Sequence, residues 1–531
     1  MLSKTDQAGL VANLFESFRQ QYGERNVALL ETHISYVLLN GQHAYKIKKA
    51  IKLDFLDFST LDRRRHYCEE ELRLNRRYAP HLYLDVVAIG GSVAAPRIES
   101  PGPAAIEYAV KMREFPQTWV AENLMASGDL HDNQIEQLAL KLASFHAECR
   151  KATHDCAYGS GDSVLQTARD NFPDIRGLLS ESADLADLAQ IEQWTETEFS
   201  ALSSLFAERK AEGFVRECHG DLHLGNLVLI DGEMSFFDCI EFNEEFRWID
   251  VMSEVAFLVM DLDAHRAADF AFLFLNAYLQ ETGDYAGLAL LRFYVVYRAM
   301  VRAKVALLQL NGKDGQEAMA KYRSYVHLVK RWMQAPAIGM ILMHGLSGSG
   351  KSRLSRRLLQ MASAIRLRSD VERKRLVQLP PSADSRSSID ADLYDSAMTE
   401  ATYRRLLFLT QAIVRAGYTI IVDATFLKCW QRKMFSDWAG AAAVPCAILC
   451  VTASPEVLRE RVARRVRKGG DASEADMRVL EHQLQTEEPL DADEAAAALV
   501  YDSTQAFDAD DNAAAVGELL ARLEKPLQGL R

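Results

Sequence analysis

The sequence feature that most constrains the fold is the stretch HGLSGSGKS at residues 344–352. It follows the apolar run GMILMHG, which predicts a buried strand, and it precedes a helical pattern. A glycine-rich turn between a strand and a helix directs backbone N–H groups towards one point, and the helix N-terminus adds a dipole that favours an anion. The stretch therefore predicts a phosphate-binding loop. Its predicted ligand-binding residues are Gly345, Ser347, Gly348, Ser349, Gly350, Lys351 and Ser352.

Two side chains of this loop have specific expected roles. Lys351 is expected to reach the β- and γ-phosphates of a nucleotide, and Ser352 is expected to bind Mg²⁺. The later strand YTIIVDATF ends at Asp423, whose carboxylate would bind the same metal through water. From residue 340 onwards strands alternate with helices, which predicts an α/β domain with a doubly wound parallel sheet.

Further candidate catalytic residues follow the loop. The stretch AIRLRSDVERKRL places Asp370 and Arg373 just after the second predicted strand. The stretch LRERVARRVRKGG places several arginines on one helix, which suits a lid over a transferring phosphoryl group; a solvated basic helix is the alternative. The run comprises Arg461, Arg464, Arg465 and Arg467, and Arg464 is the predicted catalytic member.

A second chemistry-bearing stretch, CHGDLHLGNLVLIDGEMSFFDCIEF, lies upstream at residues 218–242. His219, Asp221 and Asn226 fit the spacing H-x-D-x-x-x-x-N. The segment after Asn226 has a hairpin pattern with a DG turn, which would return Asp238 to a position beside Asn226. Phosphoryl transfer needs a group that orients the attacking hydroxyl and ligands for a metal, and these residue types can supply both.

On these motifs, residues 25 to about 330 resemble the aminoglycoside phosphotransferase family of protein-kinase-like folds. Residues 338 to about 505 resemble the P-loop kinases of the polynucleotide-kinase, gluconate-kinase and zeta-toxin type. The first resemblance implies that Asp221 orients the acceptor hydroxyl, whereas Asn226 and Asp238 hold Mg²⁺. The second implies that Asp370 is the base and that Arg373 clamps the substrate or the phosphate.

The first resemblance also implies a phosphate-anchoring lysine on a strand, paired with a glutamate on the next helix. HISYVLLNGQHAYKIKKAIKL, residues 33–53, predicts the hairpin that carries this lysine. Lys46 is the best match, and Lys48 on the same strand face is the alternate. The candidate partners are Glu69, Glu70 and Glu71, of which Glu71 is chosen on helical periodicity. No glycine-rich phosphate loop precedes Lys46, and CIEF follows Asp238 in place of Phe-Gly.

The predicted fold is an α+β bilobal protein-kinase-like domain followed by an α/β P-loop NTPase domain. The predicted parts are an N-terminal helix at 1–24, the kinase-like domain at 25–333 with its small lobe to about 112, a linker at 334–339, and the P-loop domain at 340–531.

This combination predicts a bifunctional phosphotransferase whose two domains bind Mg-ATP and phosphorylate hydroxyl groups of small molecules. A second hypothesis is that one domain is a catalytically weak nucleotide sensor that regulates the other. A third is a nucleic-acid end kinase. Against it, the residues from 336 onwards carry equal numbers of acidic and basic side chains and no basic stripe interleaved with aromatics.

The remaining composition bears on substrate and location. The whole net charge of −13 lies before residue 336, which would suit a neutral or cationic substrate. Glu241, Glu244 and Glu245 fit either a site for a cationic sugar or a solvated helix start. No secretory signal and no apolar run of about 20 residues is evident, and the eight cysteines are scattered, so a cytoplasmic protein without a membrane partner is predicted. The sequence indicates no oligomeric state.

Overall fold

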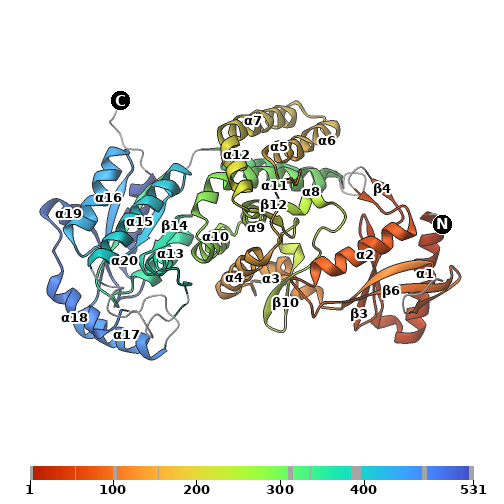
Figure 1. The fold of residues 1–531 in the computed structure, drawn as a ribbon, viewed down its shortest axis with the longest axis horizontal. Coiled ribbons are helices and arrows are strands. Elements are labelled where there is room, and N and C mark those ends of the chain that lie inside the picture. The colour runs from red at the N-terminus through yellow and green to blue at the C-terminus, as the bar shows by residue number, and fades with distance from the viewer. Residues whose placement is uncertain are drawn as a thin grey trace. The chain divides into compact units, whose positions relative to one another are not determined.

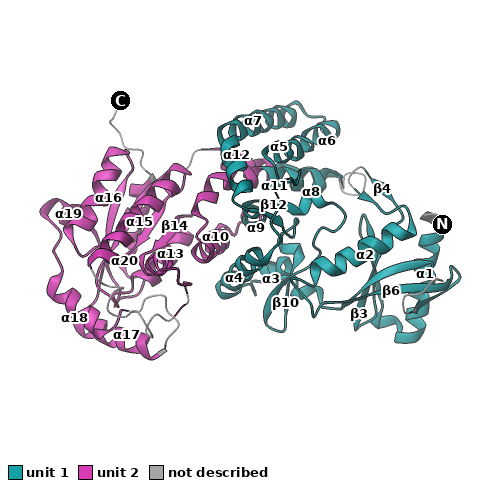
Figure 2. Ribbon diagram, viewed as in Figure 1, with its two compact units in different colours: residues 1–262, 297–323 teal, residues 263–296, 324–531 magenta. Residues whose placement is uncertain are grey.

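The computed structural model describes residues 4–53, 56–99, 105–153, 155–308, 315–334, 337–381, 383, 396–468 and 475–524. The chain divides into two compact units, one made of residues 1–262 and 297–323 and the other of residues 263–296 and 324–531 (Figure 2). Within the described ranges, no helix combines the length and the apolar character needed to cross a membrane.

An antiparallel sheet is the framework of the N-terminal lobe of the first unit (Figure 1). The predicted hairpin is present, because β2 (Ser35–Leu39) pairs with β3 (His43–Lys48) across the NGQ turn. The described strands follow the order β1-β2-β3-β8-β6-β7. The other strands of this sheet are β1 (Ala28–Glu31), β6 (Tyr83–Ser92), β7 (Ala95–Glu99) and β8 (Glu107–Arg113). The lobe also contains η1 (Glu24–Asn26), β4 (Lys52–Leu53) and β5 (Leu56–Asp57).

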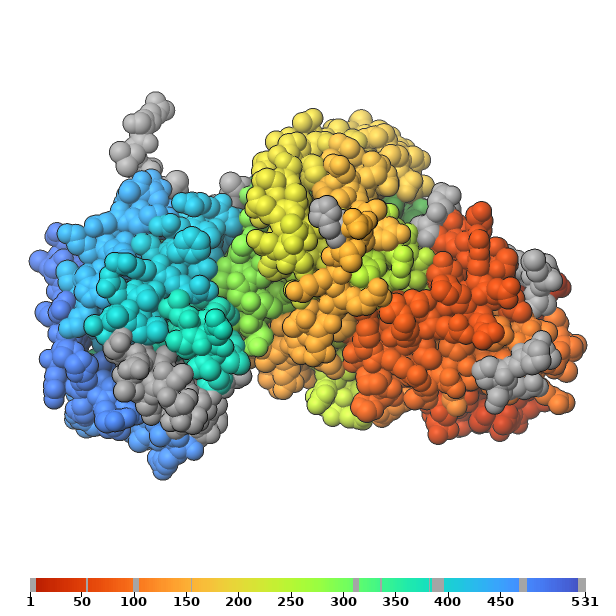
Figure 3. Space-filling model, in the orientation of Figure 1, coloured from red at the N-terminus to blue at the C-terminus, as the bar shows by residue number. Residues whose placement is uncertain are grey.

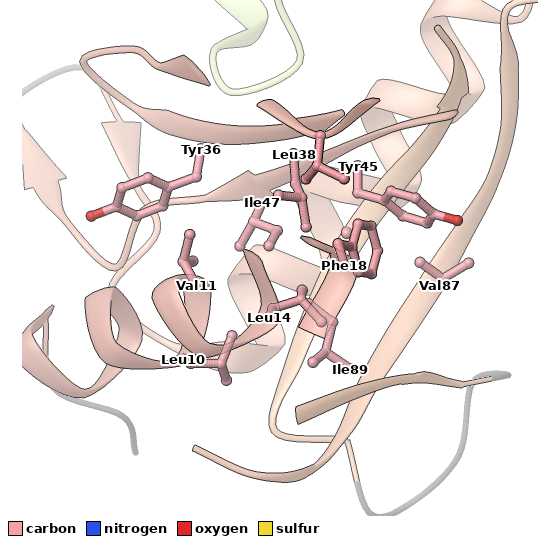
Figure 4. Packing of buried hydrophobic residues seen from close by; sticks show 12 residues of the cluster. Leu10, Val11, Leu14, Phe18, Tyr36, Leu38, Tyr45, Ile47, Val87 and Ile89 are labelled. Atoms are coloured by element: carbon pink, nitrogen blue, oxygen red, sulfur yellow. The ribbon is translucent and has the colours of Figure 1, made fainter. Parts of the chain in front are cut away.

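The side chains of β3 alternate between the two faces of this sheet, as strand geometry requires. Tyr45 and Ile47 belong to a buried cluster with Leu14 and Phe18 of α1 (Lys4–Tyr22), which covers that face (Figure 4). Lys46 and Lys48 alternate with them and reach α2 (Leu61–Asn75). Figure 3 shows one face of this lobe in space-filling form, in red and orange. The strand therefore supplies a hydrophobic core on one face and two ammonium groups on the other.

The rest of the first unit is mainly helical, as the sequence predicts. Its helices are η2 (Gln117–Trp119), α3 (Ala121–Ser127), α4 (Asp132–Glu148), α5 (Gly161–Arg169), α6 (Asn171–Leu178), α7 (Ser182–Ala211), η3 (Leu224–Asn226), α8 (Glu244–Arg247) and most of α9 (Val251–Ala264). Strand β9 (Val215–Glu217) pairs with β12 (Trp248–Asp250). The predicted second hairpin is formed by β10 (Leu227–Ile230) and β11 (Glu233–Phe236). Asp231 and Gly232 form its turn with φ values of 53° and 86°, the left-handed conformation that such a tight turn needs.

A five-stranded parallel sheet lies within the described part of the second unit, in the order β14-β15-β13-β16-β17. This confirms the doubly wound α/β fold predicted from the alternating pattern. Strand β13 is buried along its whole length, which explains its unbroken apolar sequence. The strands are β13 (Met340–His344), β14 (Ile365–Arg368), β15 (Ile420–Asp423), β16 (Cys446–Thr452) and β17 (Leu499–Asp502). The helices after β13 are α13 (Lys351–Met361), α14 (Ser369–Leu376), α15 (Ser396–Arg415), α16 (Cys429–Ala441), α17 (Pro455–Lys468), α18 (Met477–Thr486), α19 (Ala492–Ala497) and α20 (Asp510–Glu524).

The second unit also includes a helix that the sequence prediction assigns to the kinase-like domain. This helix, α10 (Ala268–Thr282), packs against α13 and against β14, the edge strand of the parallel sheet (Figure 1). The short η4 (Tyr285–Gly287) follows it, and α11 (Leu288–Leu308) and α12 (Gly315–Met333) have residues in both units. The predicted domain boundaries, with the linker at 334–339, therefore stay a prediction.

A buried asparagine of α10 hydrogen-bonds to the outer edge of β14. The N–H of Ile365 donates to Thr419 O at 2.9 Å, beside β15, whereas the N–H of Arg366 points the other way. Asn276 Oδ1 accepts from that N–H at 2.7 Å, and Asn276 Nδ2 donates to Ala364 O at 2.9 Å. One side-chain amide thus pairs with the edge strand as a neighbouring strand would, so that these two backbone groups are satisfied.

Replacing Asn276 by Ala is expected to destabilise the second unit by about 1–3 kcal/mol, because a buried carbonyl and a backbone N–H lose their partners. Urea unfolding of the full chain measures this loss. The variant Gln280→Ala on the same helix is the control, since the Gln280 side chain is partly exposed. Equal stability of the two variants would contradict the role of Asn276.

Candidate active sites

The loop after β9 carries the H-x-D-x-x-x-x-N residues of the first unit. It is held from behind by Glu254 of α9, whose Oε1 accepts from the N–H groups of His219 at 2.7 Å and Gly220 at 2.8 Å. The other oxygen of Glu254 lies 2.7 Å from Nε2 of His146. Burial alone raises the pKa of Glu254, but the bond to His146 brings it below its usual value, so that Glu254 is a carboxylate. A buried charge that is bound in this way fixes the backbone of the loop.

Two more buried side chains anchor the same loop. Asp261 Oδ2 accepts from the N–H of Leu224 at 2.8 Å. Arg298 of α11 donates to Gly220 O at 3.3 Å and to Ser253 Oγ at 3.0 Å. Sequence reasoning did not identify Glu254, Asp261 or Arg298. Each is a charged residue within a predominantly apolar helix. A charged side chain in such a helix is the sequence signal from which each could have been found.

Asp221, Asn226 and Asp238 lie close together in the structure. Asn226 Nδ2 donates to the carbonyl oxygen of Asp221 at 2.9 Å and to its Oδ2 at 3.1 Å. The N–H of Phe237 donates to Asn226 O at 3.0 Å, so the β10–β11 hairpin returns Asp238 beside Asn226. The imidazole of His219 lies 2.8 Å from Phe237 O and ties the loop to this returning segment.

The environment of Asp221 keeps its side chain ionised. Burial alone raises the pKa of Asp221, but His223 and, to a lesser extent, Arg302 and His219 lower it well below its usual range. His223 Nε2 lies 3.4 Å from Asp221 Oδ2. Asp221 is therefore a carboxylate at neutral pH, able to accept a hydrogen bond from a hydroxyl group.

Lys46, Glu71 and Asp238 form a connected ionic cluster. Lys46 Nζ donates to Glu71 Oε1 at 2.9 Å and also contacts Asp238 Oδ1. Lys48 Nζ binds the second oxygen of Glu71 at 2.6 Å, so both candidate lysines reach the same glutamate. The other two candidate glutamates point elsewhere, since Glu69 pairs with Arg65 and Glu70 with Arg73.

Asp238 is positioned by a residue that sequence reasoning did not find. Its N–H donates to the hydroxyl of Tyr83 on β6 at 2.9 Å, and Asp238 has a φ of 62°, a left-handed conformation. Its carboxylate is 43% exposed, whereas that of Glu71 is fully buried. Asp238 is thus the member of the ionic cluster that is open to an incoming ligand.

Glu241, Glu244 and Glu245, which the sequence offered as an acidic site for a cationic sugar, each have a different partner in the structure. Glu241 is buried and bound by Lys48. Glu244 pairs with Arg247 at 3.0 Å, and Glu245 accepts from Ser163 Oγ at 2.7 Å. Glu241 is therefore not available for a joint acidic site with Glu244 and Glu245, and a solvated helix start does not describe it.

The glycine-rich loop of the second unit lies between β13 and α13, as predicted. Gly345 and Gly350 have φ values of 142° and 100°, which favour glycine, and a Cβ at Gly345 would lie 2.4 Å from Val451 O. Gly348 and the buried Ser349 complete the turn, and Ser352 lies in the first turn of α13.

Lys351 is buried and folded back on the loop. Its Nζ donates to the carbonyl oxygens of Gly345 at 2.7 Å and Leu346 at 2.8 Å. Burial lowers the pKa of Lys351 to about 8, although Asp423, Asp370 and Glu487 oppose the shift. The loop therefore stabilises the charged form of Lys351 only weakly. This favours movement of the ammonium group from the loop carbonyl oxygens towards an anionic ligand.

Asp423 and Asp370 lie near enough to Lys351 to act on its charge. Asp423, at the end of β15, is buried, and its Oδ2 accepts from Ser355 Oγ at 2.9 Å. Asp370 and the buried Arg373 both lie on α14, directly after β14. Their predicted roles stay predictions.

The arginines of α17 differ in their positions. Arg461 donates to Gly348 O at 3.3 Å and to Ser503 Oγ at 2.7 Å. Arg465 donates to Ala475 O at 2.6 Å and lowers the pKa of Lys351. Arg464, the predicted catalytic member, is exposed. The helix face with Arg461 and Arg465 is the one that approaches the loop, whereas Arg464 and Arg467 are exposed.

Helix α18 also contacts the loop, and sequence reasoning did not anticipate this contact. Gln483 Oε1 accepts from the N–H of Ser347 at 2.9 Å. Leu480 and Leu346 share a hydrophobic cluster below it. One turn further along, Glu487 Oε1 lies 3.9 Å from His344 Nε2 and acts on the charge of Lys351.

The lowered pKa of Lys351 gives a pH dependence with a defined sign. With a pKa of about 8, the free ammonium group of Lys351 loses its proton near pH 8, and a phosphate bound as predicted would keep it protonated. In an Asp238→Asn background that disables the other site, Mg-ATP affinity should fall about tenfold between pH 7 and pH 9, with proton uptake on binding. Calorimetry in buffers of different ionisation enthalpy measures both quantities.

The control for this experiment is Lys351→Arg, which keeps its charge at pH 9. Its affinity is expected to be lower but nearly independent of pH. An affinity of the Lys351 chain that does not change between pH 7 and pH 9 would contradict the assignment.

Two family models match consecutive parts of the chain. Residues 56–291 match the family model described as the phosphotransferase enzyme family, and residues 340–490 match one described as an AAA domain. An uncharacterized protein of Mycobacterium tuberculosis (strain H37Rv) is 28% identical over 448 residues, which cover 83% of this chain and 87% of that protein.

Solved structures show similarity at lower identity. A choline/ethanolamine kinase family protein from Mesorhizobium loti is 13% identical, with a TM-score of 0.40, over 63% of this chain and 96% of its own. A gluconokinase from Sinorhizobium meliloti 1021 is 21% identical, with a TM-score of 0.23, over 35% of this chain and 93% of its own. The family models and the fold together show a kinase-like domain that matches the phosphotransferase enzyme family model, followed by a P-loop kinase-like domain.

Proposed function

We propose that this chain is a bifunctional ATP-dependent phosphotransferase whose two centres phosphorylate hydroxyl groups of small molecules. The observation that carries the proposal is the continuous cluster in the first unit, from Glu71 through Lys46 to Asp238 and, beside it, from Asn226 to Asp221. An ammonium group, metal-type oxygen ligands and an ionised carboxylate are the three components that phosphoryl transfer needs from the protein.

Asp221 is the residue proposed to act on the acceptor. Its carboxylate would accept the hydrogen bond of the attacking hydroxyl and receive its proton as the new O–P bond forms. The bond between the γ-phosphorus and the β,γ-bridging oxygen of ATP would break in the same transfer, and ADP would leave. Lys46 would bind phosphate oxygens of ATP once its contact with Asp238 is released. Its remaining bond to Glu71 would keep it oriented.

The donor sets in both units suit Mg²⁺, which prefers oxygen ligands. Asn226 and Asp238 would hold it in the first unit, and the contact of Asp238 with the Lys46 ammonium group indicates that a cation is stabilised there. Ser352 and Asp423 would hold it in the second unit. The ion would neutralise phosphate charge during transfer.

The second centre is proposed to use Lys351 on the phosphates and Asp370 on the acceptor hydroxyl, with Arg373 as a clamp. Arg461 and Arg465 replace Arg464 in this proposal as the arginines closest to the loop. Small hydroxylated molecules are the proposed substrates of both centres.

The test measures phosphorylated products by mass spectrometry after incubation with ATP, Mg²⁺ and a library of hydroxylated metabolites. A chain with Lys351→Met should retain the products of the first centre. Adding Asp221→Asn should reduce their rate of formation by about 10²–10⁴-fold, the usual effect of a lost general base.

The matched control is Asp231→Asn, the same substitution at the exposed turn of the neighbouring β10–β11 hairpin. Its rate should equal that of the Lys351→Met chain alone. If Asp221→Asn behaves like this control, Asp221 is not the base. If the Lys351→Met chain yields no product across the library, the first unit is better explained as a nucleotide sensor.

A further inference from the structure

The ionic cluster of the first unit contains a second lysine and a second glutamate behind the pair that faces the ligand. Lys48 is 1% exposed and Glu241 is 3% exposed, and their side chains are in contact. Lys48 also donates to Glu71 Oε2 at 2.6 Å, while Lys46 donates to Glu71 Oε1 at 2.9 Å. The two oxygens of Glu71 are thus divided between one partly exposed and one buried ammonium group.

The surroundings of Lys48 prevent it from reaching a ligand. Its Nζ lies 5.0 Å from the centre of the buried Phe58 ring. Burial alone lowers the pKa of Lys48, but Glu241 and then Glu71 raise it on balance, so Lys48 stays charged. A charged lysine without access to solvent requires nearby carboxylates, and these two are its partners.

Glu241 is fixed from its other side. Its backbone oxygen accepts from Nη1 of Arg247 at 3.2 Å, and Nε of the same guanidinium lies 3.3 Å from Glu217. Arg247 and Glu217 are themselves buried. Glu241 is therefore not free to follow Lys48, and the position of Lys48 is set by Glu241.

We propose that Lys48 and Glu241 are a positioning pair, which holds Glu71 so that one of its oxygens remains directed at Lys46. The proposal rests on the proposed function, because it assigns Lys46 to the nucleotide. Lys48 and Glu241 touch neither substrate nor metal and act through Glu71.

The charge balance of the cluster gives this pair a distinct signature. Without the charge of Glu241, Glu71 is the remaining carboxylate that pairs with the Lys48 ammonium group. Lys48 then competes with Lys46 for Glu71. Without Lys48, the two buried carboxylates of Glu241 and Glu71 have Lys46 as their nearest lysine. Both attract the Lys46 ammonium group and so hold it away from the phosphates. Removing both charges leaves the simple pair of Lys46 and Glu71.

The experiment is a double-mutant cycle on the full chain in a Lys351→Met background, with Mg-ATP binding as the readout. Glu241→Gln and Lys48→Met should each weaken binding about tenfold, the effect of a disturbed charge-assisted hydrogen bond. The double variant Lys48→Met/Glu241→Gln should bind within about threefold of the parent chain. This recovery is non-additivity of the kind expected for directly coupled residues.

A purely structural role predicts a different result. The control variant Arg209→Met/Asp250→Asn removes another buried ion pair of the same unit, whose atoms lie 2.7 Å apart. It should lower the melting temperature without changing Mg-ATP affinity. If the two single variants lose stability but bind Mg-ATP as the parent does, or if the double variant is as weak as the product of the singles, the proposal is wrong.

Crystal structures of the variants without nucleotide test, independently of Mg-ATP binding, whether the Lys46–Glu71 bond depends on Glu241. In Glu241→Gln, Lys46 Nζ should lie beyond hydrogen-bond distance of Glu71, and in the double variant the bond should be restored. An unchanged Lys46–Glu71 bond in Glu241→Gln overturns the proposal. A parent chain that binds no Mg-ATP, with the bond broken as expected, would refute the proposed function of the first unit and leave the positioning pair supported.

Discussion

A charge that is removed from water must be paired inside the protein, and this constraint determines much of the geometry of both units. An unpaired buried ion costs several kcal/mol, so each such ion restricts its partners to a few positions. Glu71 restricts two lysines of β3, and Glu254 restricts two backbone N–H groups and His146. In the second unit Arg432 is 1% exposed and binds Glu494, Phe426 O and Pro489 O.

The same constraint separates two kinds of residue in the first unit. The side chains behind the site, such as Glu254, Glu241 and Lys48, are buried and fully engaged with other protein groups. The side chains that face a ligand, Asp238 and Asp221, are partly exposed. The buried side chains behind the site pre-organise the residues in front of them. Polar ligands can then bind without much rearrangement of the protein.

Much of the fold could be predicted because the local signals are strong. The period-2 pattern of β3 and the strand–turn–helix context of the glycine-rich loop each depend on a few neighbouring residues. Glu71 could be selected over Glu69 and Glu70 because helical periodicity decides which face a residue occupies. The relation of Asp221, Asn226 and Asp238 followed from the DG turn, since a two-residue turn fixes the register of a hairpin.

The rest depends on contacts between distant segments, which no local pattern contains. The burial of Glu241 depends on a lysine 193 residues away, so the sequence near Asp238 resembled a solvated acidic patch. The arginines of α17 are a different case, because Leu458 and Val462 mark the buried face of that helix. Arg461 and Arg465 flank that face, and the apolar pattern would have favoured them over Arg464.

Helix α10 has a consequence for how chains of this type can recombine. It lies within the segment that matches the phosphotransferase family, residues 56–291, yet its Asn276 pairs with the edge of the parallel sheet. A crossover at residues 334–339 would transfer the P-loop sequence without the helix that covers β14. The new host would have to supply a suitably placed amide, or the hybrid would expose an unpaired strand edge, which promotes aggregation. Recombination that preserves solubility is therefore expected to move α10 together with the P-loop domain.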